Sequence, residues 1–179
     1  MGGLAMMDDA QLLELHRRCR QAIRFVLDGL DESGLRERDP ARGYSIAEEV
    51  GHLVAAEHYF LADDLGVDPG FPHMDRYKGQ NASAAELRER LDLIEERWPQ
   101  LLSEHPDKRE LRYIIARMSL HTLYHMARVV DRRVRMEPDF KLPHWSKPGS
   151  WEYAIEPLLD SVEDKDVTQK PDTGEEKKK

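Results

Sequence analysis

The sequence predicts an all-α fold, a four-helix bundle followed by a short C-terminal helix and a disordered charged tail. Leu, Ala, Glu and Arg are frequent while aromatic residues make up only 7% of the 179 residues, and this composition favours helix over strand. Apolar residues recur at steps of three and four, and no stretch alternates apolar and polar residues as a half-buried strand would. Capping boxes of the form Ser-x-x-Glu at Ser45 and Ser83 mark two helix starts.

The first two predicted helices cover residues 8–30 and 45–65. An aspartate at position 8 or 9 can cap the first helix. Its apolar residues recur on one face, at Leu12, Leu15, Cys19, Ala22, Val26 and Leu30. Glycine and proline then interrupt the pattern over residues 31–43, and the second helix is expected to stop at Gly66.

Two further long helices and a short one complete the prediction. The third helix begins at Ser83 and contains Pro99, which is expected to kink or shorten it. Its inward positions are Leu87, Leu91, Ile94, Trp98 and Leu101. The fourth helix, over residues 107–136, is the longest and holds neither Pro nor Gly. A short amphipathic helix over residues 150–160 is expected to pack on the bundle through Trp151, Ile155 and Leu158 or Leu159.

Length and patterning predict one domain over residues 1–162. Residues 163–179 are nearly all charged or polar, so they cannot bury enough apolar surface to fold and are expected to form a disordered tail. The connections over residues 31–44 and 66–82 are long for a minimal bundle, so they are expected to carry crossovers or to roof a cavity.

Charge and cysteine content exclude several classes of function. The net charge of −8 argues against a protein that coats nucleic acid or anionic membrane, and no run of about 18 apolar residues occurs. The single cysteine, Cys19, excludes an internal disulfide and a four-cysteine zinc site. The first nine residues lack the basic and apolar segments of a signal peptide, so we expect a cytoplasmic protein.

Two of the eight histidines, His121 and His125, lie four residues apart on the longest helix. A four-residue step rotates a helix by about 40° net, so both imidazoles project from one face and can converge on one cation. They continue a mainly apolar stripe formed by Ile114, Met118 and Val129, which predicts that they point into the bundle. The alternative is a pair of histidines that only hydrogen-bond to nearby groups.

A third ligand would have to come from another helix. His52 lies among apolar residues of the second helix, and Gly51 beside it would let a neighbouring backbone approach closely. His58 is expected to face elsewhere and His16 is ambiguous, whereas the remaining histidines fall in loops or at helix ends, at His73, His105 and His144. Three histidines would leave an open coordination position for water, as in catalytic metal sites.

Both histidine segments resemble motifs of the DinB-like superfamily, a group of metal-dependent hydrolases and thiol-dependent S-transferases. The first is Ile46-Ala-Glu-Glu-Val-Gly-His52-Leu-Val-Ala-Ala-Glu57, and the second is His121-Thr-Leu-Tyr-His125-Met-Ala-Arg-Val129. The resemblance covers most of residues 8–160. It implies a four-helix bundle in which His52, His121 and His125 bind one divalent metal ion (zinc, nickel or iron), and frequent homodimers.

The resemblance also implies an enzyme that activates either a low-molecular-weight thiol or water for reaction with a small molecule. Glu49 and Glu57 are acid–base candidates, and Glu49 could also accept a hydrogen bond from an imidazole. Arg128 stands, after Ala127, where many relatives have Gly-Gln, and either binds an anionic substrate group or forms a surface salt bridge. A non-catalytic, metal-stabilised bundle and a small-ligand-binding module remain the alternatives. Cys19 is expected in the core, so a reactive thiol would arrive with the substrate.

Overall fold

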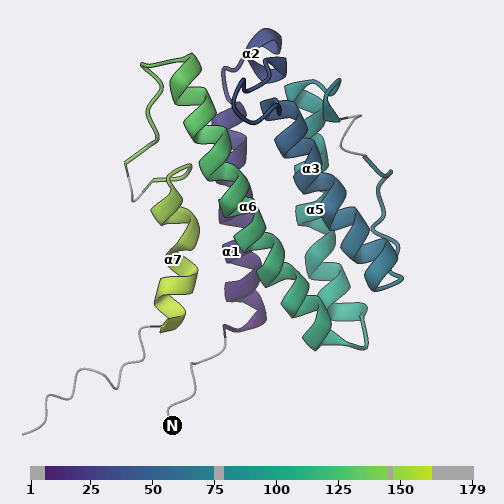
Figure 1. Cartoon of the computed structure of the whole chain (residues 1–179). Helices are drawn as coiled ribbons and strands as arrows, with labels where there is room; N and C mark the ends of the chain where they lie inside the picture. The colour runs from purple at the N-terminus through teal and green to yellow at the C-terminus, as the bar shows by residue number, and fades with distance from the viewer. Residues whose placement is uncertain (1–6, 75–78, 145–146, 163–179) are drawn as a thin grey trace, which may run out of the picture.

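The computed structural model describes residues 7–74, 79–144 and 147–162, and within these ranges it contains helices and no strand. Four long helices form the bundle: α1 (Asp9–Leu27), α3 (Ile46–Tyr59), α5 (Ala84–Glu104) and α6 (Lys108–Met136). The all-α prediction is therefore confirmed (Figure 1). The charged tail over residues 163–179 lies outside the described residues. No helix of the described ranges combines the length and apolarity needed to cross a membrane.

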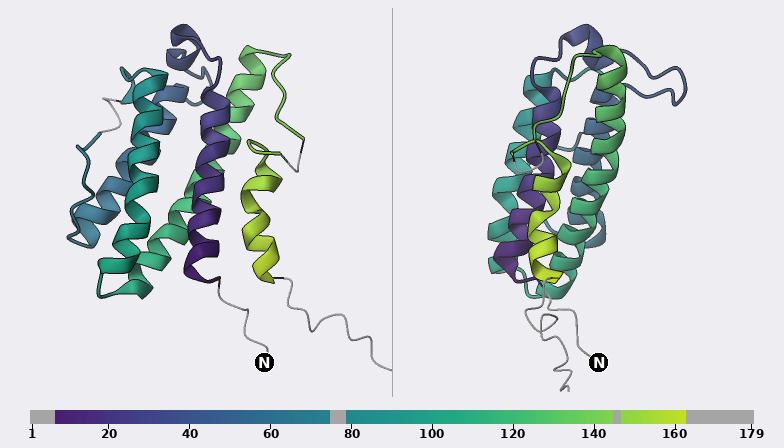
Figure 2. Two further views of the ribbon diagram at one scale, coloured as in Figure 1. Left: turned by 180° about the vertical axis from the view of Figure 1, so that it is seen from behind. Right: turned by 90° about the vertical axis from the view of Figure 1, so that its left-hand side faces the viewer.

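Each of α1 and α3 packs against both α5 and α6, so these two helices occupy opposite corners of the bundle. A fifth helix, α7 (Trp151–Val162), lies along the outside of α1 (Figure 2). The core is mostly aliphatic, with Trp98 and Phe71 as its large aromatic residues. Its largest fully buried apolar side chains are Ile23, Leu27, Leu35, Ile46, Leu53, Leu61, Leu87, Leu91, Ile94, Trp98 and Leu111. Cys19 is fully buried within it, as expected.

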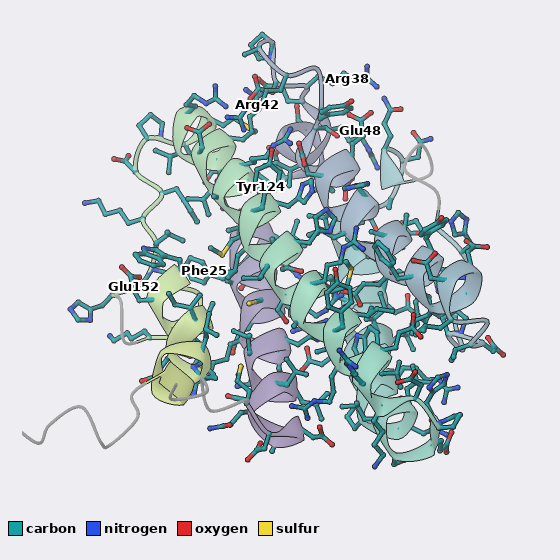
Figure 3. The ribbon with its side chains drawn as sticks, turned by 60° about the horizontal axis from the view of Figure 1, so that its bottom comes forward. Phe25, Arg38, Arg42, Glu48, Tyr124 and Glu152 are labelled. Atoms are coloured by element: carbon teal, nitrogen blue, oxygen red, sulfur yellow. The ribbon has the colours of Figure 1, made fainter. Side chains whose placement is uncertain are left out.

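The two long connections have distinct roles in the architecture. Helices α3 and α5 run in the same direction, so the chain between them returns along the outside of the bundle, which is the expected crossover (Figure 1). Phe71 and Met74 of this segment are buried against the core. The other connection forms a short helix, α2 (Glu32–Arg36), over one end of the bundle. At that end Arg38 pairs with Glu48 on the first turn of α3 (2.8 Å; Figure 3).

The predicted helix starts are confirmed by their caps. Ser45 accepts a hydrogen bond from the N–H of Glu48, whose carboxylate accepts one from the Ser45 N–H, and the same exchange links Ser83 and Glu86. Asp8 caps α1 in the same way with Gln11. These side chains satisfy backbone donors that the first helical turn leaves without partners, which fixes where each helix begins.

Three helix boundaries differ from the prediction. The first helix ends at Leu27, just before Gly29 adopts a positive φ of 68°, and the Asp31 carboxylate then accepts the Gly34 N–H and caps α2 inside the expected break. The second ends in a π-helical turn, η1 (Phe60–Asp64), in which the Leu65 N–H donates to the Phe60 carbonyl five residues back. The third is not shortened at Pro99 but runs on to Glu104, since the buried residues on either side of that proline offset one lost backbone hydrogen bond.

The prediction that Trp151 packs on the bundle is wrong, because this side chain is 48% exposed. The backbone of Gly149 approaches the Phe25 ring of α1 so closely that a Cβ at this position would lie 2.6 Å from the ring. The chain therefore meets α1 just before α7 begins, and α7 packs through the fully buried Ala154 and the partly buried Leu158. Ile155 is partly buried, and the side chain of Leu159 lies outside the described part.

Candidate metal centre

The three histidines singled out in the sequence lie together between α3 and α6. One ring nitrogen of each of His52, His121 and His125 lies within 4.8 Å of the corresponding nitrogen of the others. The ring centroids are 5.2 Å apart for His52 and His121, 4.9 Å for His52 and His125, and 4.5 Å for His121 and His125. Because α3 supplies one imidazole and α6 supplies two, the group depends on the packing of these helices.

The spacing of the nitrogens fits a shared cation. Nε2 of His121 and Nε2 of His125 are 3.0 Å apart. Two nitrogens that each lie about 2.0–2.1 Å from one tetrahedral ion are roughly 3.3 Å apart, so only a small adjustment is needed. This group of three imidazoles could therefore hold a metal ion.

The inward orientation predicted from the apolar stripe is confirmed. Met118 and Val129, on the same face of α6, are buried, and His125 is only 5% exposed. His52 and His121 are half-buried, so solvent reaches these two imidazoles but hardly reaches His125. Gly51 allows the approach of a neighbouring backbone, since a Cβ there would lie 2.7 Å from the Cα of Gly79.

Glu49 fixes the orientation of the most buried imidazole. Nδ1 of His125 donates to the carboxylate of Glu49 at 2.5 Å, because a carboxylate only accepts. Nε2 of His125 is then the nitrogen with a free lone pair, and it faces the other two rings. A carboxylate that holds a histidine in this way is a recurrent support of metal ligands.

Arg128 is held by the same carboxylate. Its Nη2 lies 2.5 Å from Glu49, and its Nη1 donates to the Tyr124 hydroxyl at 3.3 Å (Tyr124 is labelled in Figure 3). Of the two roles considered for Arg128, the geometry fits a salt bridge, and that salt bridge is to the buried Glu49 rather than to a surface group. Arg128 thereby supports the orientation of His125.

The environment keeps His121 neutral. Burial, and secondarily the neighbouring His125, lowers the pKa of His121 to about 4. Its Nδ1 is buried and has no hydrogen-bond partner among the described residues. An imidazole that stays unprotonated at neutral pH keeps a lone pair for a cation, so this residue fits a metal ligand chemically as well as geometrically.

A cavity of about 670 Å³ opens beside the group, and His52 and His121 form part of its wall. The rest of the wall comes from α3, η1, α6 and the crossover segment, through Ala55, Ala56, Tyr59, Phe60, His73, Arg117 and Met118. The expectation that a long connection roofs a cavity is met in part, since the crossover segment contributes His73. A small molecule in this cavity would lie directly against two of the three imidazoles.

The other histidines lie elsewhere. His58 packs against Phe71 and His73, with ring centroids 5.5 Å and 4.7 Å away, and so faces away from the three histidines as expected. His16, whose position was ambiguous, lies in a buried network with Arg20, Glu57 and Trp98. His105 accepts from the backbone at the start of α6, and His144 is exposed.

The expectation that Glu57 serves as an acid–base group beside the metal is wrong. Glu57 follows His52 by five residues, a net rotation of about 140°, so it points toward α1 and α5 instead. There its carboxylate accepts from Trp98 Nε1 at 3.2 Å and pairs with Arg20.

Arg117, the one fully charged residue on the described part of the cavity wall, was missed by sequence reasoning. Arg117 precedes His121 by four residues, and this helical spacing could have placed it beside the site. Phe60 follows His52 by eight residues, a spacing that keeps the two near one face of a helix, and it is the first residue of η1.

A family model described as the DinB superfamily matches residues 15–130. The matched range runs from α1 into α6 and contains all three histidines together with Glu49 and Arg128. No curated protein and no solved structure matches the chain.

Proposed function

The chain belongs to the DinB superfamily, and from that premise we propose that it is a metal-dependent enzyme in which His52, His121 and His125 hold one divalent ion. The observation that carries the proposal is the convergence of three imidazoles at the wall of a cavity. Zinc, nickel and iron all accept imidazole ligands, so each is a candidate. A divalent ion at this position would supply a Lewis acid that lowers the pKa of a thiol or water bound to it.

The residues of this chain would prepare the site before any reactant enters. Glu49 holds the Nδ1–H of His125 and so presents Nε2 to the cation, while Arg128 holds Glu49 in place. The neutral His121 offers a lone pair at physiological pH. The two half-buried rings leave the cavity side of the site accessible to a small molecule.

Transfer of a thiol is the reaction that the cavity supports best. No carboxylate is among the described residues that line the cavity, so a general base for hydrolysis would have to be a histidine such as His73. A thiol needs only a modest lowering of its pKa to react near neutral pH. Its sulfur would bond to an electrophilic carbon as the leaving group departs with its electron pair, and its proton would pass to solvent.

The thiol would come from a small molecule rather than from the chain. Cys19 is the only cysteine and is fully buried, and burial raises the pKa of its thiol to about 12. A protonated, inaccessible sulfur cannot act as a nucleophile. The proposed partners are therefore a low-molecular-weight thiol and an electrophile.

The test is an assay of metal-loaded protein with a panel of small thiols and an activated aryl halide, in which loss of free thiol is followed. We expect turnover that requires metal, falls more than about 100-fold in His121→Ala and is kept in His144→Ala, which removes an exposed histidine. Equal turnover without metal would contradict the proposal. Release of acid from ester or amide substrates would instead identify a hydrolase, and metal binding without any turnover would identify a non-catalytic, metal-stabilised bundle.

We further propose that the protein forms a homodimer through the outer face of α6. Tyr113, Leu120 and Tyr124 are 63%, 57% and 60% exposed, and their spacing of seven and four residues places them on one side of the helix. Exposed apolar groups arranged in this way are typical of an interaction surface. Sedimentation should give a dimer that Leu120→Glu converts to a monomer, and a wild-type monomer at all concentrations would contradict this.

A further inference from the structure

The cavity beside the three histidines has an unusual charge for this protein. The chain carries 35 acidic and 27 basic residues. The described residues of the cavity wall nevertheless include one arginine, the histidines His52, His73 and His121, and no carboxylate. Any cation held by the histidines would add further positive charge. The recess is therefore electrostatically suited to a negative ligand in an otherwise acidic protein.

Arg117 is the only fully charged side chain on the described wall, and it differs from most arginines of α6. Five others pair with carboxylates: Arg112, Arg128, Arg132, Arg133 and Arg135. Arg117 forms no ion pair with any described residue, and its guanidinium carbon lies 4.3 Å from the centroid of the Phe60 ring. A guanidinium held on an aromatic face keeps its N–H groups for a planar anion.

Apart from Arg117, the histidines and the Tyr59 hydroxyl, the described wall is apolar. Ala55, Ala56 and Phe60 come from α3 and η1, and the buried Met118 comes from α6. A cavity of about 670 Å³ has the size of a typical small-molecule site, in which a few polar groups fix the orientation of a mostly apolar ligand. Arg117 precedes His121 by one helical turn, so an anion at Arg117 would lie one turn from the candidate metal ligands.

We propose that this cavity binds a small organic carboxylate, with its charged group on Arg117 and its apolar part against Phe60 and Met118. The proposal rests on the proposed function in one respect, because it takes the bound molecule to be a reactant of the enzyme. The carboxylate selects the reactant and fixes its depth in the cavity, so that its reactive atom lies beside His52 and His121. Arg117 is thus a specificity-determining residue.

Binding of phenylacetate and of its neutral analogue phenylacetamide to metal-free protein tests the site. The two probes have nearly the same shape and differ in charge, so calorimetric titration isolates the contribution of the arginine. We expect the wild-type protein to bind phenylacetate at least about tenfold more tightly than the amide, as a charge-assisted hydrogen bond would give. Arg117→Gln should remove that preference, and Arg109→Gln, an exposed arginine two turns away on the same helix, should keep it.

Equal affinities for the two probes in the wild-type protein, or an unchanged preference in Arg117→Gln, would overturn the proposal. Thermal unfolding of each variant checks that it is folded, which is expected because Arg117 is exposed. Since these titrations use no metal, they stand even if the metal-dependent activity is not found. Failure of the proposed function and failure of the anion site are therefore separate results.

Steady-state kinetics with metal-loaded protein then identify which reactant carries the carboxylate. In one arm 3-mercaptopropionate is compared with 2-mercaptoethanol, and in the other a carboxylated aryl halide is compared with its neutral analogue. Arg117→Gln should raise the KM of the charged reactant about tenfold in one arm and leave its neutral counterpart unchanged. An equal effect on charged and neutral reactants in both arms would contradict a carboxylate subsite.

Discussion

Two polar clusters lie between the helices of the bundle, and α3 contributes to both. The first joins His16, Arg20, Glu57 and Trp98, and each of these residues is at most 1% exposed. The second is the group of His52, His121 and His125 with Glu49, which opens on a cavity. Helix α3 contributes His52 to the open cluster and Glu57, five residues later, to the sealed one, yet only the open cluster is accessible from a cavity.

The clusters differ in charge balance as well as in access. In the sealed cluster the Glu57 carboxylate is paired with the Arg20 guanidinium and also contacts His16 and Trp98. In the open cluster the one carboxylate, that of Glu49, contacts His125 and is also paired with Arg128. A buried ion pair of equal and opposite charges stabilises one packing of the helices. Neutral imidazole nitrogens beside a cavity, in contrast, keep lone pairs that can bind a cation.

The largest effect should come from the sealed cluster. Glu57→Gln leaves the fully buried Arg20 without its carboxylate, so we expect the free energy of unfolding to fall by about 3–5 kcal/mol. Urea titration measures this loss. The paired change Arg20→Met with Glu57→Leu removes both charges and should recover most of the stability. A Glu57→Gln protein as stable as the wild type would show that the cluster does not have the structural role assigned to it.

Gly51→Ala should act on the open cluster alone. The added methyl group would lie 2.7 Å from the Cα of Gly79, and because that neighbour is backbone it must move. We expect a loss of about 1–3 kcal/mol in the free energy of unfolding, typical of an overpacked contact, together with weaker metal binding through the adjacent His52. Unchanged stability in Gly51→Ala would contradict the close approach of the two backbones.

Glu49→Gln tests whether a supporting carboxylate tunes the open cluster. The amide cannot offer His125 a charged acceptor, so we expect the dissociation constant for zinc to rise about 10–100-fold while the fold is retained. Competition with a chelator of known affinity gives the constant. Glu48→Gln, one position earlier, is the matched control and should leave it unchanged. Identical zinc affinities in the Glu49→Gln and wild-type proteins would remove Glu49 from the site.

The smallest effect is the pH dependence of the sealed cluster. Burial holds the pKa of His16 well below its ordinary value, so the folded state keeps the ring neutral. The unfolded chain binds a proton below about pH 6.5, and stability therefore falls as the pH drops below this value, by at most about 1.4 kcal/mol per pH unit. Unfolding at pH 7 and pH 5 should show a smaller loss in His16→Gln than in the wild type. A larger or equal loss in the variant would contradict a neutral buried His16.

Much of the fold followed from local signals in the sequence. The capping boxes at Ser45 and Ser83 and the long uninterrupted α6 act within one or two helical turns, so their geometry depends on neighbouring residues alone. The same holds for the inward face of His121 and His125. Helix α2 and the turn η1 were not predicted. Helix α2 begins at a cap from one residue, Asp31, and η1 depends on the hydrogen bond from the Leu65 N–H to the carbonyl five residues back.

The part of the site that depends on the spacing of residues within a single helix could be predicted from the sequence. The pair on α6 and the neighbouring Glu49 and His52 on α3 could be placed on faces, but the rotation of Glu57 toward Arg20 depended on which helices flank α3. The contact between Arg117 on α6 and Phe60 in η1 likewise depends on how these two segments pack. Contacts between distant segments are set by tertiary packing, which spacing within a single helix does not encode.

Titration of metal-free protein with cobalt(II) shows whether His52, His121 and His125 form one metal site. Absorption in the visible range reports the ligands of the ion, and stoichiometry reports the number of sites. We expect one cobalt ion per chain in the wild type and in His144→Ala, with X-ray absorption showing a shell of imidazole nitrogens. The His52→Ala, His121→Ala, His125→Ala triple variant should bind none at this site. Equal binding by the folded triple variant and the wild type would show that these histidines do not hold the ion.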